Sequence, residues 1–262
     1  MDKWYEVPGK AGTNVIYSRV RLVRNLKEYP FPGRLTKEQS AELSEKLLGG
    51  LTGIASMDRM QYRFTHLERM GDLEKTALLE RRAINRSVMK KKDPTGMILS
   101  EDESTAILLN GDDHVRIQTL QTGLTLDRLY EKADRIDDYI SERFDYAFDE
   151  KYGYLTSFPT NVGTGLRAAV VLHLPMLSKN KNFNSLVADM GRFGTQVRGV
   201  YGEGAENFGS LYQISNQKTL GQTEREIIDI VRKAALELDV QERRVRESRC
   251  RRPMNAINPT AS

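Results

Sequence analysis

The sequence has 262 residues, 39% of them apolar and 29% charged, which is typical of a soluble globular protein with a real core and excludes a disordered chain. The single cysteine excludes an internal disulfide and fits a reducing cytosol. The apolar runs are too short to cross a bilayer and the N-terminus has no signal-peptide pattern, so we expect a cytoplasmic protein without a membrane partner.

The net charge of +4 is small, and much of the excess comes from arginines between positions 243 and 252. We interpret these arginines as the solvated end of a helix, with contact to an acidic partner as the alternative. Because no aromatic residues are interleaved with them for stacking on bases, we expect no nucleic-acid partner.

The predicted elements mix strands and helices without a regular βαβ rhythm. In chain order they are a strand at 14–21, helices at 36–48 and 72–82, strands at 97–100, 105–110 and 114–120, a helix at 125–149, a strand at 167–174, a helix at 184–193, strands at 196–201 and 210–216, and a helix at 222–247. This order predicts an α+β fold with a mostly antiparallel sheet.

Arginines recur at alternate positions of the first strand. In the run Ser18-Arg19-Val20-Arg21-Leu22, both guanidinium groups should lie on one face because side chains alternate along a strand. Two such groups on one face suit the oxygens of a phosphate chain. A solvent-facing strand edge with two charges is the alternative interpretation of this run.

Three further runs combine polar residues with glycine or arginine. An acidic turn precedes Arg116 in the run 110–118, a Gly-Thr-Gly segment follows Phe158 in the run 156–167, and a glycine-flanked Glu203 follows a strand in the run 197–204. Glycines allow a backbone to pass close to a ligand, although no Lys-Ser/Thr pair follows as it would in a Walker loop. Each run taken alone also fits an ordinary polar hairpin or glycine-rich turn.

Together the four runs resemble the ATP:guanidino phosphotransferases, or phosphagen kinases, and most closely the bacterial protein-arginine kinases. The matching segments occur in the family's order and read Ser-Arg-Val-Arg-Leu-x-Arg-Asn, Asn-x-x-Asp-His-x-Arg-Ile-Gln, Pro-Thr-Asn-Val-Gly-Thr-Gly-Leu-Arg-Ala and Arg-Gly-x-Tyr-Gly-Glu-Gly. The resemblance implies a phosphagen kinase catalytic domain of the glutamine-synthetase-like type, with an antiparallel sheet flanked by helices. It also implies transfer of the γ-phosphoryl group of Mg·ATP to arginine side chains of protein substrates.

The resemblance further implies a nucleotide site, with ATP and Mg²⁺ as cofactors and no metal ligand among the protein side chains. The family's phosphate-binding arginines fall on Arg19, Arg21, Arg116, Arg167 and Arg198, the last two also being expected to act in catalysis. The other expected nucleotide-binding residues are Ser18, Val20, Arg82, Ala168, Ala169, Val170, Val171, Gly199, Val200, Tyr201, Gly202 and Glu203. Such a charge cluster suits phosphoryl transfer, which depends on positioning and charge stabilisation.

The resemblance places the catalytic carboxylates on Glu203 and Asp112, but this sequence departs from the family around them. Asp112 occupies the position of a glutamate and is shorter by one methylene group, a retreat of roughly 1.5 Å. Displacement by about 1 Å can cost on the order of a hundredfold in rate. Gly111 lacks a neighbouring carboxylate of the family, and Phe158 stands where the family has a reactive cysteine.

These departures leave two main hypotheses for the function, beside the weaker one of a decayed gene product without a function. One is an active protein-arginine kinase, based on the arginine cluster with Glu203 and Asp112. The other is a nucleotide-binding pseudokinase, impaired by Phe158, Gly111 and Asp112, that acts on a regulatory protein partner.

The domain organisation is expected to be a catalytic domain at 1–250 and a tail at 251–262. The resemblance implies that the family's C-terminal helical domain is missing, which puts dimer formation in doubt. The small helical domain that precedes the core in metabolic kinases is also expected to be missing, which favours a protein substrate over a free amino acid.

Overall fold

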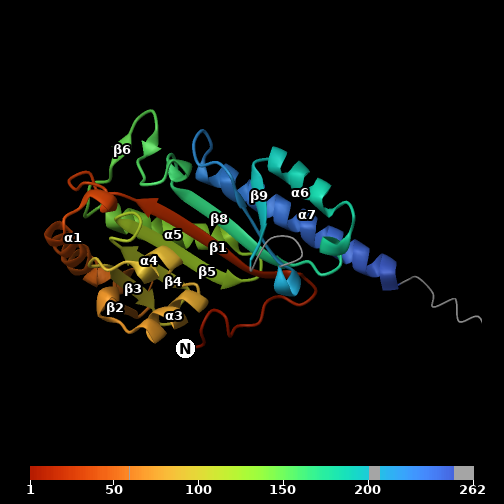
Figure 1. Cartoon of the computed structure of the whole chain (residues 1–262), viewed down its shortest axis with the longest axis horizontal. Helices are drawn as coiled ribbons and strands as arrows, with labels where there is room; N and C mark the ends of the chain where they lie inside the picture. The colour runs from red at the N-terminus through yellow and green to blue at the C-terminus, as the bar shows by residue number, and fades with distance from the viewer. Residues whose placement is uncertain (59, 201–206, 251–262) are drawn as a thin grey trace, which may run out of the picture.

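The computed structural model describes residues 1–58, 60–200 and 207–250. Its centre is an eight-stranded sheet in the order β2-β3-β4-β5-β1-β8-β10-β9, with every neighbouring pair antiparallel (Figure 1). The strands of this sheet are β1 (Val15–Arg24), β2 (Tyr62–His66), β3 (Gly96–Ser100), β4 (Thr105–Leu109), β5 (Val115–Thr122), β8 (Leu166–His173), β9 (Thr195–Gly199) and β10 (Leu211–Asn216). The predicted α+β class with an antiparallel sheet is therefore confirmed.

The helices flank this sheet, and a separate short hairpin projects beside it. The helices are α1 (Lys37–Gly50), α2 (Ala55–Asp58), α3 (Asp72–Glu80), α4 (Arg86–Lys90), α5 (Leu126–Ser141), α6 (Phe183–Arg192) and α7 (Glu224–Cys250), and the hairpin is β6 (Phe148–Asp149) with β7 (Gly153–Tyr154). Helices α5 and α7 run along one face behind β1 and β8, α1 packs on β3 and β4 from the same core, and α6 packs on β9 (Figure 1).

Side-chain alternation gives the sheet one apolar face and one mixed face. Val20 and Leu22 of β1, Val170 of β8 and Ile214 of β10 all belong to the main core under α5 and α7. On the other face, α3 and α4 cover only the β3–β4 end, where a smaller apolar cluster includes Leu108. No helix of the described residues thus covers the opposite face of β1, β8, β10 and β9.

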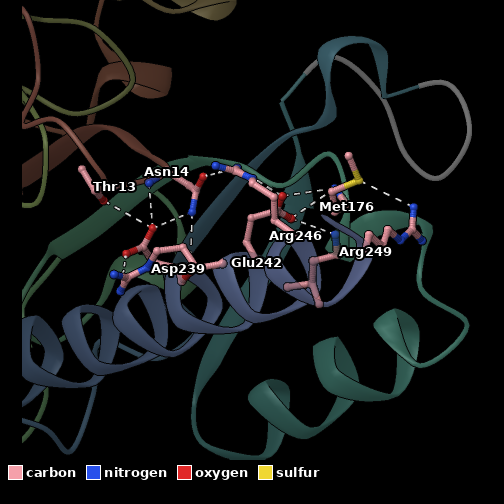
Figure 2. Close-up of polar contacts among 9 residues, drawn as sticks. Thr13, Asn14, Met176, Asp239, Glu242, Arg246 and Arg249 are labelled. Carbon is pink, nitrogen blue, oxygen red and sulfur yellow. Dashed lines mark hydrogen bonds and ion pairs between the residues drawn. The ribbon is translucent and has the colours of Figure 1, made fainter. Parts of the chain in front are cut away.

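Helix α7 is fixed to the rest of the domain by two buried carboxylates (Figure 2). Asp239 accepts hydrogen bonds from the backbone N–H of Asn14 at 2.7 Å and from its Nδ2 at 2.9 Å. Glu242 accepts the backbone N–H of Leu177 at 2.7 Å, and Arg246 donates to Asn14 Oδ1 at 2.6 Å. These contacts satisfy backbone donors of the segments that flank β1 and β8, so they hold the ends of both strands.

Most predicted elements are present, with one clear error. The helix predicted at 36–48 is α1, and a capping box begins it, since Thr36 Oγ1 accepts from Gln39 N at 3.2 Å and Gln39 Oε1 accepts from Thr36 N at 3.0 Å. The helix predicted at 125–149 is wrong beyond Ser141. The following residues pair with the chain after β1, where Ala147 N donates to Asn25 O at 2.7 Å, and this pairing replaces helical hydrogen bonds.

Candidate active site

The uncovered face of the sheet carries a cleft of about 740 Å³. Its walls come from β1, β5, β8, β9 and β10, from the N-terminal end of α4, and from the loops after β4 and before β8. The lining residues are Arg19, Arg21, Val23, Asn85, Ser87, Asp112, Asp113, Arg116, Phe158, Thr160, Asn161, Arg167, Ala169, Gln196, Arg198, Gln213, Ser215 and Gln217.

The five arginines expected from the sequence all line this cleft. The prediction that Arg19 and Arg21 share one face is confirmed, because both point away from the core that contains Val20. The strand register places Arg21 directly opposite Arg167 of β8. Arg116 of β5 and Arg198 of the edge strand β9 complete the cluster.

The five arginines of the cluster lack an ion-pair partner among the described carboxylates. Among the residues that the structure describes, none of the five arginines forms an ion pair; those that do are Arg24, Arg69, Arg81, Arg143, Arg192, Arg232, Arg243 and Arg246. The Nε atoms of Arg21 and Arg116 are buried without a hydrogen-bond partner there. Unsatisfied buried donors beside uncompensated charge are costly unless an anion binds.

Burial and repulsion between the guanidinium groups lower the pKa values of Arg21 and Arg116. Burial, with repulsion from Arg19, lowers the pKa of Arg116 to about 10, although Asp112 and Asp113 oppose the shift. Burial followed by repulsion from Arg116 also holds the pKa of Arg21 well below its usual value. With a pKa of about 10, Arg116 is still protonated at neutral pH and adds to the positive charge of the cleft.

Neighbouring polar groups aim three of the arginines. Arg19 Nη2 donates to Gln213 Oε1 at 2.9 Å, and Arg116 Nη2 donates to Gln118 Oε1 at 3.0 Å. Arg167 is held most firmly, by Asn161 Oδ1 at 3.2 Å and by three backbone carbonyls, those of Asn216 at 2.6 Å, Thr160 at 3.0 Å and Gln217 at 3.4 Å. Of these supporting residues, Gln118 has a signal in the sequence, because it lies two positions after Arg116 on the same strand and therefore on the same face.

The acidic turn after β4 brings two carboxylates to the cleft in different roles. Asp112 Oδ2 accepts hydrogen bonds from Asn85 Nδ2 and Ser87 Oγ, both at 2.8 Å. Asp113 is buried, and its Oδ1 accepts from Asn25 Nδ2 and from the backbone N–H of Ser157, both at 2.7 Å. Asp113 therefore supports the loop that carries Phe158, whereas Asp112 is the partly exposed carboxylate facing the arginines.

Phe158 lines the cleft with 51% of its side chain exposed. Its carbonyl accepts from Thr156 Oγ1 at 2.8 Å and from the backbone N–H of Asn161 at 2.9 Å, which fixes the loop at the ring. The glycines that follow serve packing: at Gly163, with φ 111°, a Cβ atom would lie 2.2 Å from Thr219 O, and at Gly165 one would lie 2.6 Å from Val23 O. Neither glycine lines the cleft.

The remaining expected nucleotide residues lie in several environments. Ala169 lines the cleft, but the side chains of Val20, Ala168 and Val170 are in the core, and buried Ser18 donates to Gly123 O at 2.7 Å. Buried Val171 also lies outside the cleft lining, Gly199 ends β9, and Val200 N donates to Leu211 O at 2.9 Å. Tyr201, Gly202 and Glu203 lie outside the described residues.

Arg82 follows α3 with φ 68° and does not line the cleft. Its charge contributes to lowering the pKa of Arg19, after burial, so it adds to the same positive field. The carbonyl of Arg82 accepts a hydrogen bond from Gln118 Nε2.

Two features are absent from the described residues. No group of three or more His, Cys, Asp or Glu side chains there could hold a metal ion. No described helix is long and apolar enough to cross a membrane.

Comparison with known proteins agrees with this geometry. The family model of the ATP:guanido phosphotransferase C-terminal catalytic domain matches residues 45–245. The chain belongs to this family. Family membership implies ATP as the phosphoryl donor.

Curated relatives and solved structures of the ATP:guanido phosphotransferase family are similar over most of the chain. A protein-arginine kinase of Caldanaerobacter subterraneus subsp. tengcongensis is 41% identical over 89% of this chain and 69% of the relative, and one of Bacillus velezensis is 40% identical over 95% and 68%. Lombricine kinase aligns with a TM-score of 0.78 at 25% identity, over 89% of this chain and 67% of that one. A duplicated taurocyamine kinase from Schistosoma mansoni with bound transition-state-analogue components aligns with a TM-score of 0.80 at 26% identity, over 92% and 34%.

Proposed function

We propose that this protein is a protein-arginine kinase that transfers the γ-phosphoryl group of ATP to the guanidinium group of arginine side chains in proteins. The observation that carries the proposal is the cleft in which five arginines, none of them ion-paired with a described carboxylate, face the carboxylate of Asp112. The similarity to curated protein-arginine kinases over about nine tenths of the chain supports the same substrate class. We further propose that residues 1–250 act as one catalytic domain and work in the cytoplasm.

The arginine cluster fits a triphosphate. The buried Nε atoms of Arg21 and Arg116 have no protein partner among the described residues, and a phosphate oxygen would satisfy them. ATP supplies the phosphoryl group, and the five arginines would neutralise its charge and the charge that spreads over the transferring group. Arg167, held by four protein acceptors, is the best preorganised of them.

The acceptor guanidinium is a cation and needs a partner of opposite charge in this positive cleft. Asp112 is the described carboxylate that can pair with it, and it would take the proton that leaves nitrogen as the P–N bond forms. A guanidinium with a pKa of roughly 12.5–13.8 loses this proton only as bonding develops. Glu203, which lies outside the described residues, is proposed as the second carboxylate at the acceptor.

Mg²⁺ is proposed to arrive with the nucleotide. This ion is commonly held by substrate phosphates and water with only one or two protein carboxylates. The cleft contributes Asp112 and Asp113, of which Asp113 is already engaged by Asn25 and Ser157. The protein is therefore assigned the role of orienting the phosphates.

One observation favours the second candidate, a nucleotide-binding pseudokinase that regulates a protein partner. Phe158 occupies the cleft wall with half of its ring exposed, where a thiolate would add negative charge beside the acceptor. An aromatic face attracts a guanidinium less strongly than a charged group does. In this candidate function, the arginine cluster still binds the nucleotide, but the cleft no longer binds the acceptor guanidinium.

A matched pair of measurements on the purified chain separates the candidates. Calorimetry measures Mg·ATP binding, and acid-labile ³²P transfer to an arginine-rich protein measures catalysis. Binding with transfer supports the kinase, and binding without transfer supports the pseudokinase. Absence of both overturns the nucleotide site.

A further inference from the structure

The short helix α4 holds the side chain of Asp112 in one orientation. Two donors from the first turn of this helix region, Asn85 Nδ2 and Ser87 Oγ, reach the same oxygen, Oδ2, at 2.8 Å each. No described residue donates to the other oxygen, Oδ1. All three side chains line the cleft, so the carboxylate is anchored at one oxygen and open at the other.

The same helix also holds the backbone of the turn. Lys91, immediately after α4, donates from Nζ to the carbonyl of Asn110 at 2.6 Å and to that of Gly111 at 2.9 Å. At the start of the helix, Asn85 Oδ1 accepts the backbone N–H of Val88 at 3.1 Å. Asn85 therefore begins the helix with one atom of its amide and holds Asp112 with the other.

Gly111 permits this close docking. A Cβ atom at position 111 would lie 3.2 Å from Cγ2 of buried Val88, which is tighter than most contacts of this kind. A larger side chain would therefore push on α4, and α4 carries the two donors to Asp112. The missing side chain at 111 and the anchored carboxylate at 112 belong to one packing arrangement.

We infer that Asn85 and Ser87 are positioning residues that orient Asp112 toward the acceptor guanidinium. This inference rests on the proposed kinase function. A carboxylate fixed before the substrate binds loses less side-chain freedom in the reaction, and fixed geometry matters strongly for phosphoryl transfer. Because Asn85 and Ser87 fix Oδ2, the free oxygen Oδ1 also has a defined position. The fixed position of Oδ1 offsets the shorter reach of the aspartate side chain, because the acceptor guanidinium can bind against it.

The test compares variants that differ by one donor. Ser87→Ala removes the hydroxyl group, Ser87→Thr keeps it, and Asn85→Ser keeps an acceptor for Val88 N while removing the amide donor. Arg86→Ala is the matched control, because Arg86 is exposed and lies between the two donors. Steady-state transfer from ATP to an arginine-rich protein gives kcat and KM, and thermal melting reports folding.

The inference predicts that Ser87→Ala and Asn85→Ser each lower kcat by roughly tenfold, as expected for losing one hydrogen bond to a charged group. KM for ATP should stay within about twofold, since the phosphate-binding arginines are untouched. Ser87→Thr should retain wild-type kcat, as should Arg86→Ala.

Other outcomes contradict the inference in distinguishable ways. An active wild type with unchanged kcat in Ser87→Ala overturns the positioning role and leaves the kinase function standing. A parallel fall of kcat and melting temperature without rescue by threonine assigns α4 a structural role only. A wild type that transfers no phosphate overturns the kinase function and this inference together.

Discussion

Arg21 of β1 and Arg167 of β8 lie directly opposite each other in the antiparallel register, and neither forms an ion pair with a described carboxylate. Like charges opposite each other destabilise a sheet. Repulsion from Arg167 is one of the causes, after burial, Arg116 and Arg19, that lower the pKa of Arg21. The cleft thus holds electrostatic strain that an anion relieves.

Removing the charge of Arg21 should stabilise the nucleotide-free fold and lower the activity. Arg21→Gln is expected to raise the free energy of unfolding of the nucleotide-free protein by about 1 kcal/mol, a usual gain when strain at a functional site is removed. The same change should lower kcat/KM by roughly a hundredfold through loss of charge stabilisation. Urea unfolding and transfer kinetics measure the two effects. Arg198→Gln is the control, because Arg198 is exposed. This change is expected to lower kcat/KM without raising the free energy of unfolding.

Phosphate-bearing ligands should stabilise the folded protein. A ligand that binds only the native state at about 100 times its Kd adds about 2.7 kcal/mol to the free energy of unfolding. We expect ADP and pyrophosphate to raise the melting temperature of the wild type, and to do so much less in Arg21→Gln. An equal rise in both proteins would place the anion outside the cleft.

Phe158→Cys should raise arginine phosphorylation if the aromatic ring limits the acceptor site. A thiolate there would add negative charge beside the guanidinium, and the gain should grow with pH as the thiol ionises. The assay is ³²P transfer between pH 7 and pH 9, with Phe158→Ser as the control that removes the ring without adding charge. Equal activity of the two variants would mean that bulk, and not charge, is what matters.

The buried pair between Arg24 and Asp137 should support the loop before β8. Arg24 donates from Nη2 to Asp137 Oδ2 at 2.7 Å and from Nη1 to Thr164 O at 2.9 Å, and its guanidinium lies 3.5 Å from the ring centroid of Tyr154. Asp137→Ala leaves a buried charge unpaired, which costs about 3–5 kcal/mol. The free energies of unfolding of the wild type and Asp137→Ala, measured in urea, test this prediction.

An exposed ion pair in the same region provides the control for Asp137→Ala. Glu142→Ala breaks the surface contact with Arg143 and should change the free energy of unfolding by less than about 1 kcal/mol. Comparable losses in the two variants would contradict a special role for the buried pair.

His114 should make the fold sensitive to mild acid. Its Nδ1 accepts the backbone N–H of Leu26 at 2.9 Å and its Nε2 donates to Pro30 O at 2.9 Å, so the neutral ring fits this site. Burial lowers the pKa of His114 to about 4 from a usual value of 6.5. As the pH falls, His114 is therefore protonated in the unfolded chain before it is protonated in the folded protein. The free energy of unfolding is highest above about pH 6.5 and decreases as the pH falls toward 4.

The size of this effect is about 3 kcal/mol at most, from 1.36 kcal/mol per pKa unit. Urea unfolding between pH 7 and pH 4 measures it, and His114→Gln should flatten the slope in that window. An unchanged slope would assign the acid sensitivity to other groups.

The arginine half of the site could be predicted from the sequence because it follows strand alternation. Arg19 and Arg21 are separated by one apolar residue, and a period of two fixes their common face before any tertiary contact is known. The family resemblance then predicted that Arg116, Arg167 and Arg198 belong to the same phosphate-binding site, and all three line the cleft. These residues lie on strands that the sequence pattern predicted at 114–120, 167–174 and 196–201.

The support of Asp112 could not be predicted in this way. Asn85 and Ser87 are more than twenty residues away in sequence, and α4 has only five residues, too few for a helical periodicity to show. The end of α5 was missed for a similar reason. Apolar Phe144 continues the helical pattern, but the chain around Tyr146 pairs with Leu26 instead.

The most direct test of the central claim is transfer of ³²P from labelled ATP to an arginine-rich protein by the wild-type chain, with Arg21→Gln measured beside it. The account predicts acid-labile label on arginine side chains of the substrate, reduced roughly a hundredfold in the variant. Binding of Mg·ATP without any transfer by the wild type would contradict it and leave the pseudokinase as the function of this cleft.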